Sequence, residues 1–157
     1  MQLRPAQPDD DPFLASVRRP EVAGEFSSLV EPGEPAVAVD VHRMIVALDD
    51  GTPIGSLSWH GMPYGPNRRS VAWNIGITIL PAFRGRGHGA ESQRRLADHL
   101  FATTDVNRVE ASTDVENVAE QRALERAGFR RECVVRGAQY RAGAWHDLVL
   151  YARLRHD

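Results

Sequence analysis

The residues with the clearest chemical meaning are three glycines and two arginines within the seven positions Arg84-Gly85-Arg86-Gly87-His88-Gly89-Ala90. Glycines at alternate positions let a backbone turn tightly and bring its bare N–H groups close to a ligand. A helix that begins at this point directs the positive end of its dipole toward the same place. The stretch is therefore predicted to form a cradle for a diphosphate.

Residues 71–80, which precede this loop, alternate bulky and small side chains. The bulky set is Val71, Trp73, Ile75, Ile77 and Ile79, and the set between them is small or partly polar. This period of two predicts a strand with one buried face. Gly76 within it indicates that another group approaches the backbone closely.

Local patterns predict the other elements of the chain. Residues 49–53 are turn material between two apolar runs, so residues 44–59 are expected to form a hairpin. Helices are predicted near residues 13–17, over 24–30, from about 90 to 103 and over 117–127; strands are predicted over 108–113, 129–141 and 145–154. This order favours one α/β domain over residues 1–157, with a mixed, largely antiparallel sheet of about six or seven strands flanked by helices.

Composition excludes several classes of function. A net charge of -2 without a basic run disfavours nucleic acid as a partner, and no run approaches the length of a membrane span. The single cysteine, Cys133, suits a reducing compartment and is expected to be a small buried side chain. The six histidines lack metal-site spacing. We therefore expect a cytoplasmic protein that needs no metal.

A dinucleotide site is the first alternative for the loop, because Gly85, Gly87 and Ala90 satisfy G-x-G-x-x-A and Glu110 follows at about the distance of a ribose-binding acid. Residues 91–157 are too few for the rest of a doubly wound sheet. Residues 81–84 also separate the strand from the first glycine. The alternative is disfavoured, and a P-loop fails because no Gly-Lys-Ser/Thr is present.

A family resemblance fits better. Residues 84–89 resemble the (Q/R)-x-x-G-x-(G/A) signature of the GNAT superfamily of acyl-CoA-dependent N-acyltransferases, and residues 74–81 look like its cofactor-binding strand. Asn117, Glu125, Gly128 and Phe129 resemble its N-x-x-x-x-x-x-x-E-x-x-G-F segment. The C-terminal part is similar to the branch that includes ribosomal-protein N-terminal alanine acetyltransferases.

The resemblance implies acetyl-CoA as cofactor and transfer of its acetyl group to a primary amine by direct attack on the thioester. The pyrophosphate would meet the loop, and the pantetheine arm would pair with the strand at Ile75, Gly76 and Ile77, where an N–H can stabilise the oxyanion. The cofactor-binding set expected on this basis is Ile75, Gly76, Ile77, Arg84, Gly85, Arg86, Gly87, His88, Gly89, Ala90 and Asn117.

The catalytic positions depart from the family pattern. Asn74 stands where many relatives carry a glutamate base, and Leu124 stands where many carry the tyrosine that protonates the thiolate. Glu120 stands where close relatives often carry serine, and its simplest role is at a helix start. The remaining hydroxyl and acid candidates, Tyr140, Tyr151 and Asp147, are more typical of packing and surface roles.

Three replacements are therefore considered for the catalytic set, each with a structural alternative. Glu110 is either a base or a salt-bridged strand residue, and His60 is either a base or a structural histidine. Asn117 either caps a helix or holds a water near the thioester.

The acceptor is an open question at this stage. A protein N-terminus, an amino acid, a polyamine and an aminoglycoside-like drug all fit, in a pocket to which Phe13, Phe26, Trp59 and Tyr64 are candidate contributors. The rival function is a non-catalytic acyl-CoA-binding or regulatory module that kept the cofactor site. The hairpin of the two closing strands is a candidate surface for a homodimer.

Overall fold

A computed structural model describes residues 1–27 and 33–157. Its centre is a seven-stranded sheet with the strand order β1-β2-β3-β4-β5-β7-β6. All neighbouring strands are antiparallel except β4 and β5, which are parallel. The strands are β1 (Gln2–Pro5), β2 (His42–Ala47), β3 (Pro53–Pro63), β4 (Val71–Ile79), β5 (Arg108–Asp114), β6 (Arg130–Arg141) and β7 (Ala144–Leu154).

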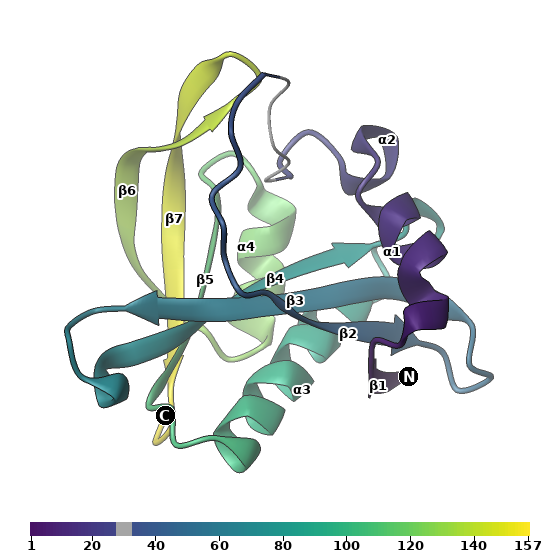
Figure 1. Cartoon of the computed structure of the whole chain (residues 1–157), viewed down its shortest axis with the longest axis horizontal. Helices are drawn as coiled ribbons and strands as arrows, with labels where there is room; N and C mark the ends of the chain where they lie inside the picture. Colours follow the sequence, from purple (N-terminus) through teal and green to yellow (C-terminus); the bar gives the residue numbers. More distant parts are fainter. Residues whose placement is uncertain (28–32) are drawn as a thin grey trace.

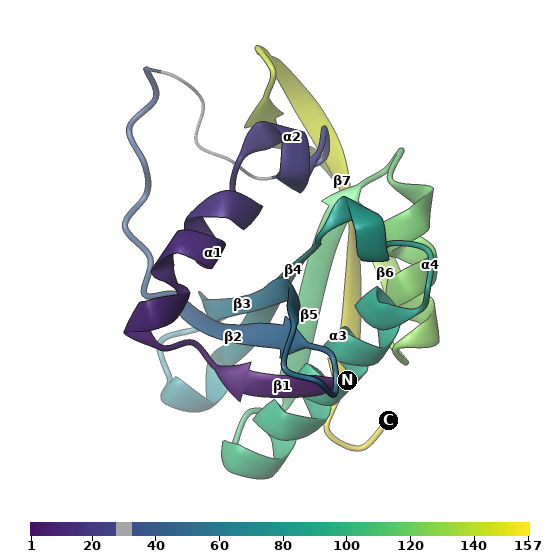
Figure 2. The same ribbon diagram turned by 90° about the vertical axis from the view of Figure 1, so that its right-hand side faces the viewer.

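Helices cover both faces of the sheet. One face, here called the α1 face, carries α1 (Asp11–Val17) and α2 (Pro20–Ala23). The other, the α3 face, carries α3 (His88–Thr103) and α4 (Val118–Arg126). Figure 1 looks onto the α1 face, and Figure 2 shows the two layers from the side. Short 3-10 turns at Pro8–Asp10, Arg68–Ser70 and Pro81–Phe83 complete the elements.

The two predicted hairpins are present, and each has the backbone that its turn requires. Gly51 lies between β2 and β3 with φ 87°, a conformation that glycine adopts without strain. The β6–β7 turn has positive φ at both central residues, 51° at Ala142 and 76° at Gly143, as a type I′ turn requires. The turn therefore matches the natural twist of the two strands that it joins.

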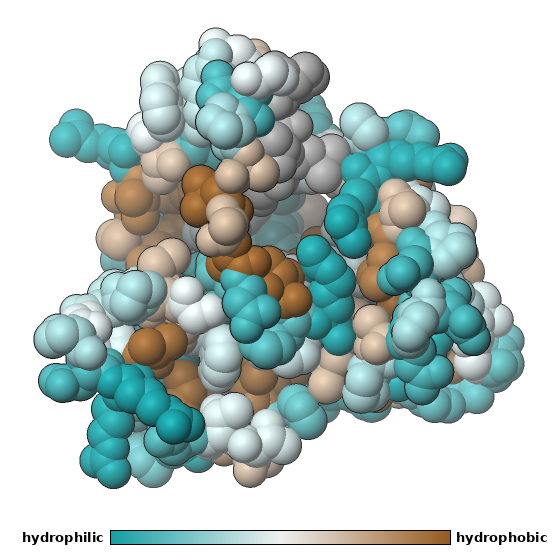
Figure 3. Space-filling view, viewed as in Figure 1, coloured by the Kyte–Doolittle hydropathy of each residue, from teal (hydrophilic) through white to brown (hydrophobic). Residues whose placement is uncertain are grey.

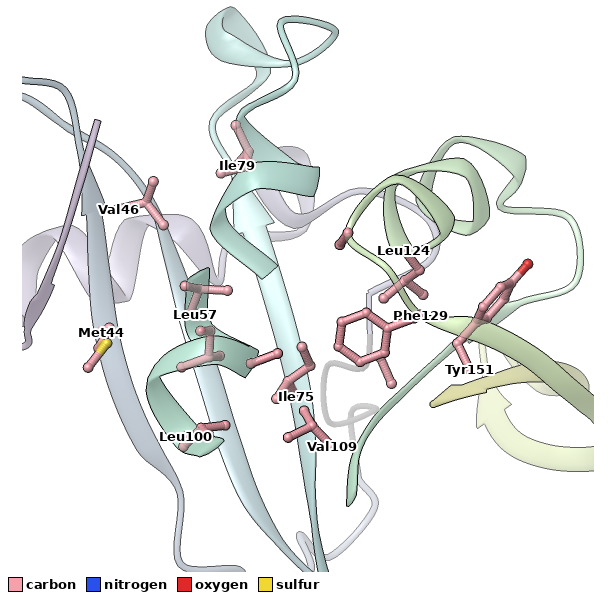
Figure 4. Close-up of a cluster of buried hydrophobic side chains, with 14 of the residues drawn as sticks. Met44, Val46, Leu57, Ile75, Ile79, Leu100, Val109, Leu124, Phe129 and Tyr151 are labelled. Atoms are coloured by element: carbon pink, nitrogen blue, oxygen red, sulfur yellow. The ribbon is translucent and has the colours of Figure 1, made fainter. Parts of the chain in front are cut away.

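The main core lies between the sheet and the two helices of the α3 face. Strands contribute residues such as Val46, Leu57, Ile75 and Val109, and α3 contributes Leu96, whose side chain has no exposed surface. Figure 4 shows these strand residues beside Leu124, Phe129 and Tyr151, which extend the cluster toward α4 and β7. Apolar residues at helical spacing in α3 thus fix the helix against alternate residues of the strands.

The parallel pairing of β4 with β5 is short. Its register contains two residue pairs, Trp73 with Val109 and Asn74 with Glu110. Beyond these pairs the strands diverge, as Figure 1 shows, so the later part of β4 faces an opening instead of a neighbouring strand. Half of the peptide groups of residues 75–79 point toward this opening, because successive groups of a strand alternate in direction.

The predicted architecture is confirmed, with seven strands and flanking helices, but two local predictions need correction. Cys133 is exposed, because it lies in β6, the last strand of the sheet, which has open surface on both sides. The helix expected over 24–30 is not found in the described part: α2 ends at Ala23, Gly24 follows with φ 89°, and residues 28–30 lie outside the described residues. No helix of the described residues is long and apolar enough to cross a membrane.

Candidate functional site

The glycine loop has the geometry of an anion cradle. Gly85 and Gly87 have φ of 73° and 82°, which favour glycine, and Gly87 is the residue from which α3 begins. A Cβ added at Gly85, Gly87 or Gly89 would meet no atom within 4 Å, so the space beside all three is open. None of the N–H groups of residues 85–90 donates to an oxygen of another described loop or side chain. Unpaired N–H groups at a helix start, facing open space, fit a diphosphate.

The two arginines of the loop differ in their contacts. The Arg84 guanidinium donates from Nε to the Ile79 carbonyl at 2.9 Å and from Nη2 to the Val22 carbonyl, just before the end of α2. Arg84 therefore fastens the loop to β4 and to the N-terminal segment. Arg86 is exposed and lies over the Phe83 ring at 5.8 Å. Of the two, Arg86 is the one whose charge remains available to a ligand.

Gly76 was expected to lie close to another group, and the group that approaches it belongs to the neighbouring strand of the sheet. A Cβ at this position would meet the Ser58 Oγ of the neighbouring strand β3 at 3.1 Å. Ile75 and Ile77 flank it on the part of β4 that faces the opening. The structure thus explains the glycine by packing, and it leaves the backbone edge of these three residues toward β5 without a partner strand.

His60, Asn74 and Glu110 come together on the α1 face. They occupy directly paired positions on β3, β4 and β5, so their side chains form one row across three strands at the base of the opening. His60 is partly buried, and its ring makes no hydrogen bond with another described residue. The structure therefore brings two of the three predicted catalytic candidates, His60 and Glu110, to either side of Asn74.

Glu110 is 1% exposed and is held by three side chains. Tyr64 Oη donates to its Oε2 at 2.8 Å, Arg108 Nε donates to the same oxygen at 2.7 Å, and Asn74 Nδ2 lies 3.4 Å from Oε1. Arg108 also binds both carboxylate oxygens of Glu132, at 2.8 and 2.7 Å. These contacts hold the pKa of Arg108 above its usual value, with the Glu132 bond as the largest cause.

A hollow of about 300 Å³ lies above this network, lined by Tyr64, Arg108, Glu132 and Leu150. Tyr64 comes from the loop after β3 and lines one side of it; its predicted role in an acceptor pocket stays a prediction. Trp59, another expected contributor, lies on the α3 face, stacked on His42 at 5.3 Å between ring centroids. Strand alternation places it there, since Trp59 is paired with Ile75 of the core.

The start of α4 lies behind the opening. Asn117 caps the helix: its Oδ1 accepts from the Glu120 N–H at 3.3 Å, and its Nδ2 donates to Thr113 Oγ1 at 3.0 Å. Both ends of the predicted Asn117 side chain are thus used locally. Gln93 of α3, which is 1% exposed, donates to the Gly89 carbonyl at 3.3 Å and also faces the Glu120 carboxyl. Burial raises the pKa of Glu120 to about 7, although the Gln93 bond opposes the shift.

A cluster that sequence reasoning missed joins the N-terminal segment to the β6–β7 hairpin. Arg141, 7% exposed, donates to Asp114 at the end of β5 and to the Glu25 carbonyl at 2.5 Å, and its guanidinium lies 5.6 Å from the Phe26 ring centroid. His146 Nδ1 is 3.4 Å from Asp114 Oδ2. The cluster therefore fastens the N-terminal segment to the end of β5 and to the β6–β7 hairpin.

The other acid and hydroxyl candidates have structural partners. Tyr151 is fully buried and donates to Glu125 Oε1 at 3.1 Å, and Tyr140 packs edge-on against Trp145 at 5.3 Å. Asp147 Oδ1 accepts from the Gly137 N–H at 2.7 Å. Leu124 is a core residue, so no hydroxyl occupies that position.

The profile of a family described as "Acetyltransferase (GNAT) domain" matches residues 1–130. The chain belongs to the GNAT acetyltransferase family. YdaF and YjcK of Bacillus subtilis (strain 168), which both carry N-acetyltransferase names, are 33% identical over 110 residues and 27% identical over 148 residues. The match covers 70% of this chain and 58% of YdaF, and 94% of this chain and 77% of YjcK.

Solved GNAT structures share the fold over nearly the whole chain. Spermidine N-acetyltransferase from Vibrio cholerae, in complex with CoA and spermine, has a TM-score of 0.81 at 19% identity and covers 99% of this chain and 95% of its own. Ribosomal-protein-S5-alanine acetyltransferase from Vibrio fischeri has a TM-score of 0.78 at 18% identity, with coverage of 99% and 93%. RimJ of Mycobacterium smegmatis, in complex with CoA-disulfide, reaches 0.76 at 22%, with coverage of 97% and 80%.

These matches confirm the GNAT resemblance and the predicted fold class. GNAT acetyltransferases use acetyl-CoA as their donor. The open N–H groups of residues 85–90 fit its diphosphate, and the free edge of β4 fits an amide-containing arm.

Proposed function

We propose that this GNAT protein is an acetyl-CoA-dependent N-acetyltransferase that moves the acetyl group to a primary amine by direct attack on the thioester. The observation that supports this most directly is the opening between β4 and β5, which has the cradle of residues 85–90 at one side and the row of His60, Asn74 and Glu110 at its base. Acetyl-CoA supplies an activated acetyl group on a thiol, which is a tolerable leaving group with a reference pKa near 8.5.

In this proposal different residues of the chain bind the donor, stabilise the oxyanion and remove the amine proton. The loop N–H groups bind the diphosphate, and an N–H of residues 75–77 stabilises the charge that develops on the carbonyl oxygen. Asn74 has no group that accepts a proton, so His60 or the Glu110 network removes the amine proton, directly or through a water. An α-amine near pKa 7.8 costs only about 1 kcal/mol to deprotonate at pH 7, against about 4–5 kcal/mol for a lysine amine near 10.4, so an α-amine suits such a site better.

Glu120 is the candidate for the opposite proton transfer. It lies in the first turn of α4, beside Gln93, which is itself bonded to the cradle at Gly89. Its carboxyl is about half protonated at neutral pH, because burial raises its pKa to about 7. In our proposal it returns a proton to the departing thiolate, a role that Leu124 cannot take.

The test combines binding and turnover. Calorimetry with CoA and acetyl-CoA measures donor binding, and thiol release in the presence of an amine library measures transfer. Micromolar binding with amine-dependent thiol release supports the proposal, whereas no binding at high micromolar acetyl-CoA contradicts it. Tight binding without turnover across the library favours the rival, a non-catalytic acyl-CoA-binding module, for which the engaged Glu110 and the apolar Leu124 are the motivating observations.

For the oligomer we propose a homodimer through β6, the last strand of the sheet. Its Val134 and Val135 are 39% and 41% exposed. A second copy paired antiparallel about Val134 would set Glu132 opposite Arg136 on both sides of the two-fold axis. Sedimentation of the protein and of Val134→Lys tests it, because a monomeric wild type would contradict the proposal.

A further inference from the structure

Two arginines on the α1 face have no acidic partner among the described residues. Arg43 of β2 is partly buried, and Arg18 follows the last residue of α1. Neither guanidinium makes a hydrogen bond, an ion pair or a ring contact within residues 1–27 and 33–157, although the two are close enough to interact electrostatically. Burial, and then the charge of Arg18, lower the pKa of Arg43.

Arg43 stands in a row that leads to the opening. It is paired with Ser58 of β3, which is paired with Gly76 of β4, so all three share the α1 face. Two strand spacings of ~4.8 Å put the Arg43 backbone roughly 10 Å from that of Gly76, a gap that its long side chain partly spans. Ser58 and Gly76, the other two residues of the row, have small side chains and are only partly buried.

The buried acids on this face already have partners, and so has the exposed Glu132. Glu110 and Glu132 are bound by Arg108, Asp114 is bound by Arg141, and Asp10 is bound by Arg4. None of these acids forms an ion pair with Arg18 or Arg43 within the described residues, so both guanidinium groups keep a charge that an anionic ligand can bind. In Figure 3 hydrophilic side chains lie among apolar ones on the face of the molecule between the segment 33–41 and α1.

We infer that the acceptor amine carries a carboxylate, which Arg43 and Arg18 bind while the amine lies at the opening beside Gly76. This inference rests on the proposed transferase function and names its substrate class: acidic peptides or amino compounds with a carboxylate several ångströms from a primary amine. A guanidinium that has lost part of its water and faces a second cation gains from an anion. A polyamine would instead bring cations against both arginines, so spermidine-like acceptors are selected against.

The experiment compares matched acceptors at saturating acetyl-CoA. The amidated dipeptides Ala-Glu and Ala-Gln have nearly the same shape and differ in charge, Ala-Lys carries a cationic side chain, and spermidine represents polyamines. Ala-Gln with a free C-terminal carboxylate distinguishes a main-chain carboxylate from an acidic side chain. We expect kcat/KM for Ala-Glu-amide to exceed that for Ala-Gln-amide at least tenfold, with Ala-Lys-amide and spermidine lower still.

The variants assign this preference to the two residues. Arg43→Met is expected to remove the tenfold preference through a higher KM for Ala-Glu-amide and to leave Ala-Gln-amide unchanged, with a smaller loss for Arg18→Met. Arg19→Met, a change at an adjacent exposed arginine, serves as the matched control and should have no effect. Equal rates for the Glu and Gln peptides, a preference for spermidine, or an equal loss for both peptides in Arg43→Met overturns the inference.

Failure of the proposed function gives a different result. If CoA binds but no amine is acetylated, Ala-Glu-amide is titrated into the CoA-bound protein by calorimetry. Binding that Arg43→Met weakens at least fivefold supports the carboxylate site without catalysis, and no binding overturns it. If CoA does not bind at all, the transferase proposal fails, and the same titration without CoA decides the arginine site separately.

Discussion

Replacing Glu120 with glutamine tests whether its carboxyl sits in a desolvated position beside the cradle. The pKa of this carboxyl rises from 4.5 to about 7, mainly because burial penalises the charged form. A carboxyl whose pKa is raised by folding favours the folded state below the unfolded-state pKa, near 4.5, and loses that contribution as pH rises through 7. Glu120→Gln keeps the shape and carries no charge at any pH.

The magnitude follows from the shift. About 2.5 pKa units correspond to about 3–4 kcal/mol of differential stability, since each unit is worth about 1.4 kcal/mol. The side chain is only partly buried, and solvent at its exposed edge reduces the effect, so we expect a gain of about 1–3 kcal/mol. Relative to wild type, the variant should gain this stability between pH 4.5 and pH 8.

Urea unfolding at pH 4.5, 6, 7 and 8 measures this difference for each protein. Subtracting wild type from variant at each pH cancels the other titrating groups, which the substitution leaves in place. Glu116→Gln is the matched control, because it removes one carboxyl group at an exposed position just before α4. A Glu120→Gln difference that stays constant within about 0.5 kcal/mol from pH 4.5 to 8 would refute the reasoning.

Three further predictions concern the loop, the cap and the closing turn. Gly89→Asp should weaken CoA binding at least tenfold in calorimetry, because the new carboxylate repels the diphosphate. The melting temperature should not fall, because the Cβ position of Gly89 is open and an acidic residue suits the first turn of a helix. Gly89→Ala is the control and should bind CoA normally, and an unchanged affinity of Gly89→Asp would mean that the phosphates bind elsewhere. Asn117→Ala should lower the free energy of unfolding in urea by about 1 kcal/mol, because the helix cap is lost. Asn117→Asp keeps the accepting oxygen and should lower it by less. Equal losses for the two variants would mean that the cap hydrogen bond does not stabilise α4. Ala142→Asn should raise the free energy of unfolding in urea by about 1 kcal/mol, because φ 51° is strained for alanine and Asn-Gly suits a type I′ turn. A less stable variant would contradict the assignment of this turn type.

The elements that could be predicted are those whose signals are local. The period-two pattern of residues 71–80, the glycine loop and the Asn117 cap each depend on neighbours within a few positions, and the structure has β4, the open loop and the cap where they were expected. Two further predictions, membership of the GNAT family and acetyl-CoA as the donor, depended on the family resemblance. That resemblance required several motifs in the right order along the chain.

The partners around the site could not be predicted, because they come from distant segments. Tyr64 reaches Glu110 from 46 positions away, and Arg141 reaches the Glu25 carbonyl from 116 positions away. No local pattern carries such pairings. The exposure of Cys133 has the same origin, since alternation in a strand cannot say that the strand is the last one of its sheet. Arg43 is the clearest example, because a sequence cannot show whether an arginine has an acidic partner. That depends on which other residues the acids of the fold contact.

Arg84 joins two parts of the molecule to which our proposals give different substrates. Its guanidinium bonds the β4 end of the loop to Val22, which lies 62 positions earlier in α2, the helix that follows Arg18 of the proposed acceptor site. A protein engineer who reshapes the loop for a bulkier acyl donor would therefore also move the segment that borders the proposed acceptor site. The effects of mutations in the loop and in the N-terminal segment are not expected to be additive, because both segments contact the Arg84 side chain. Donor range and acceptor range in this scaffold would have to be redesigned together.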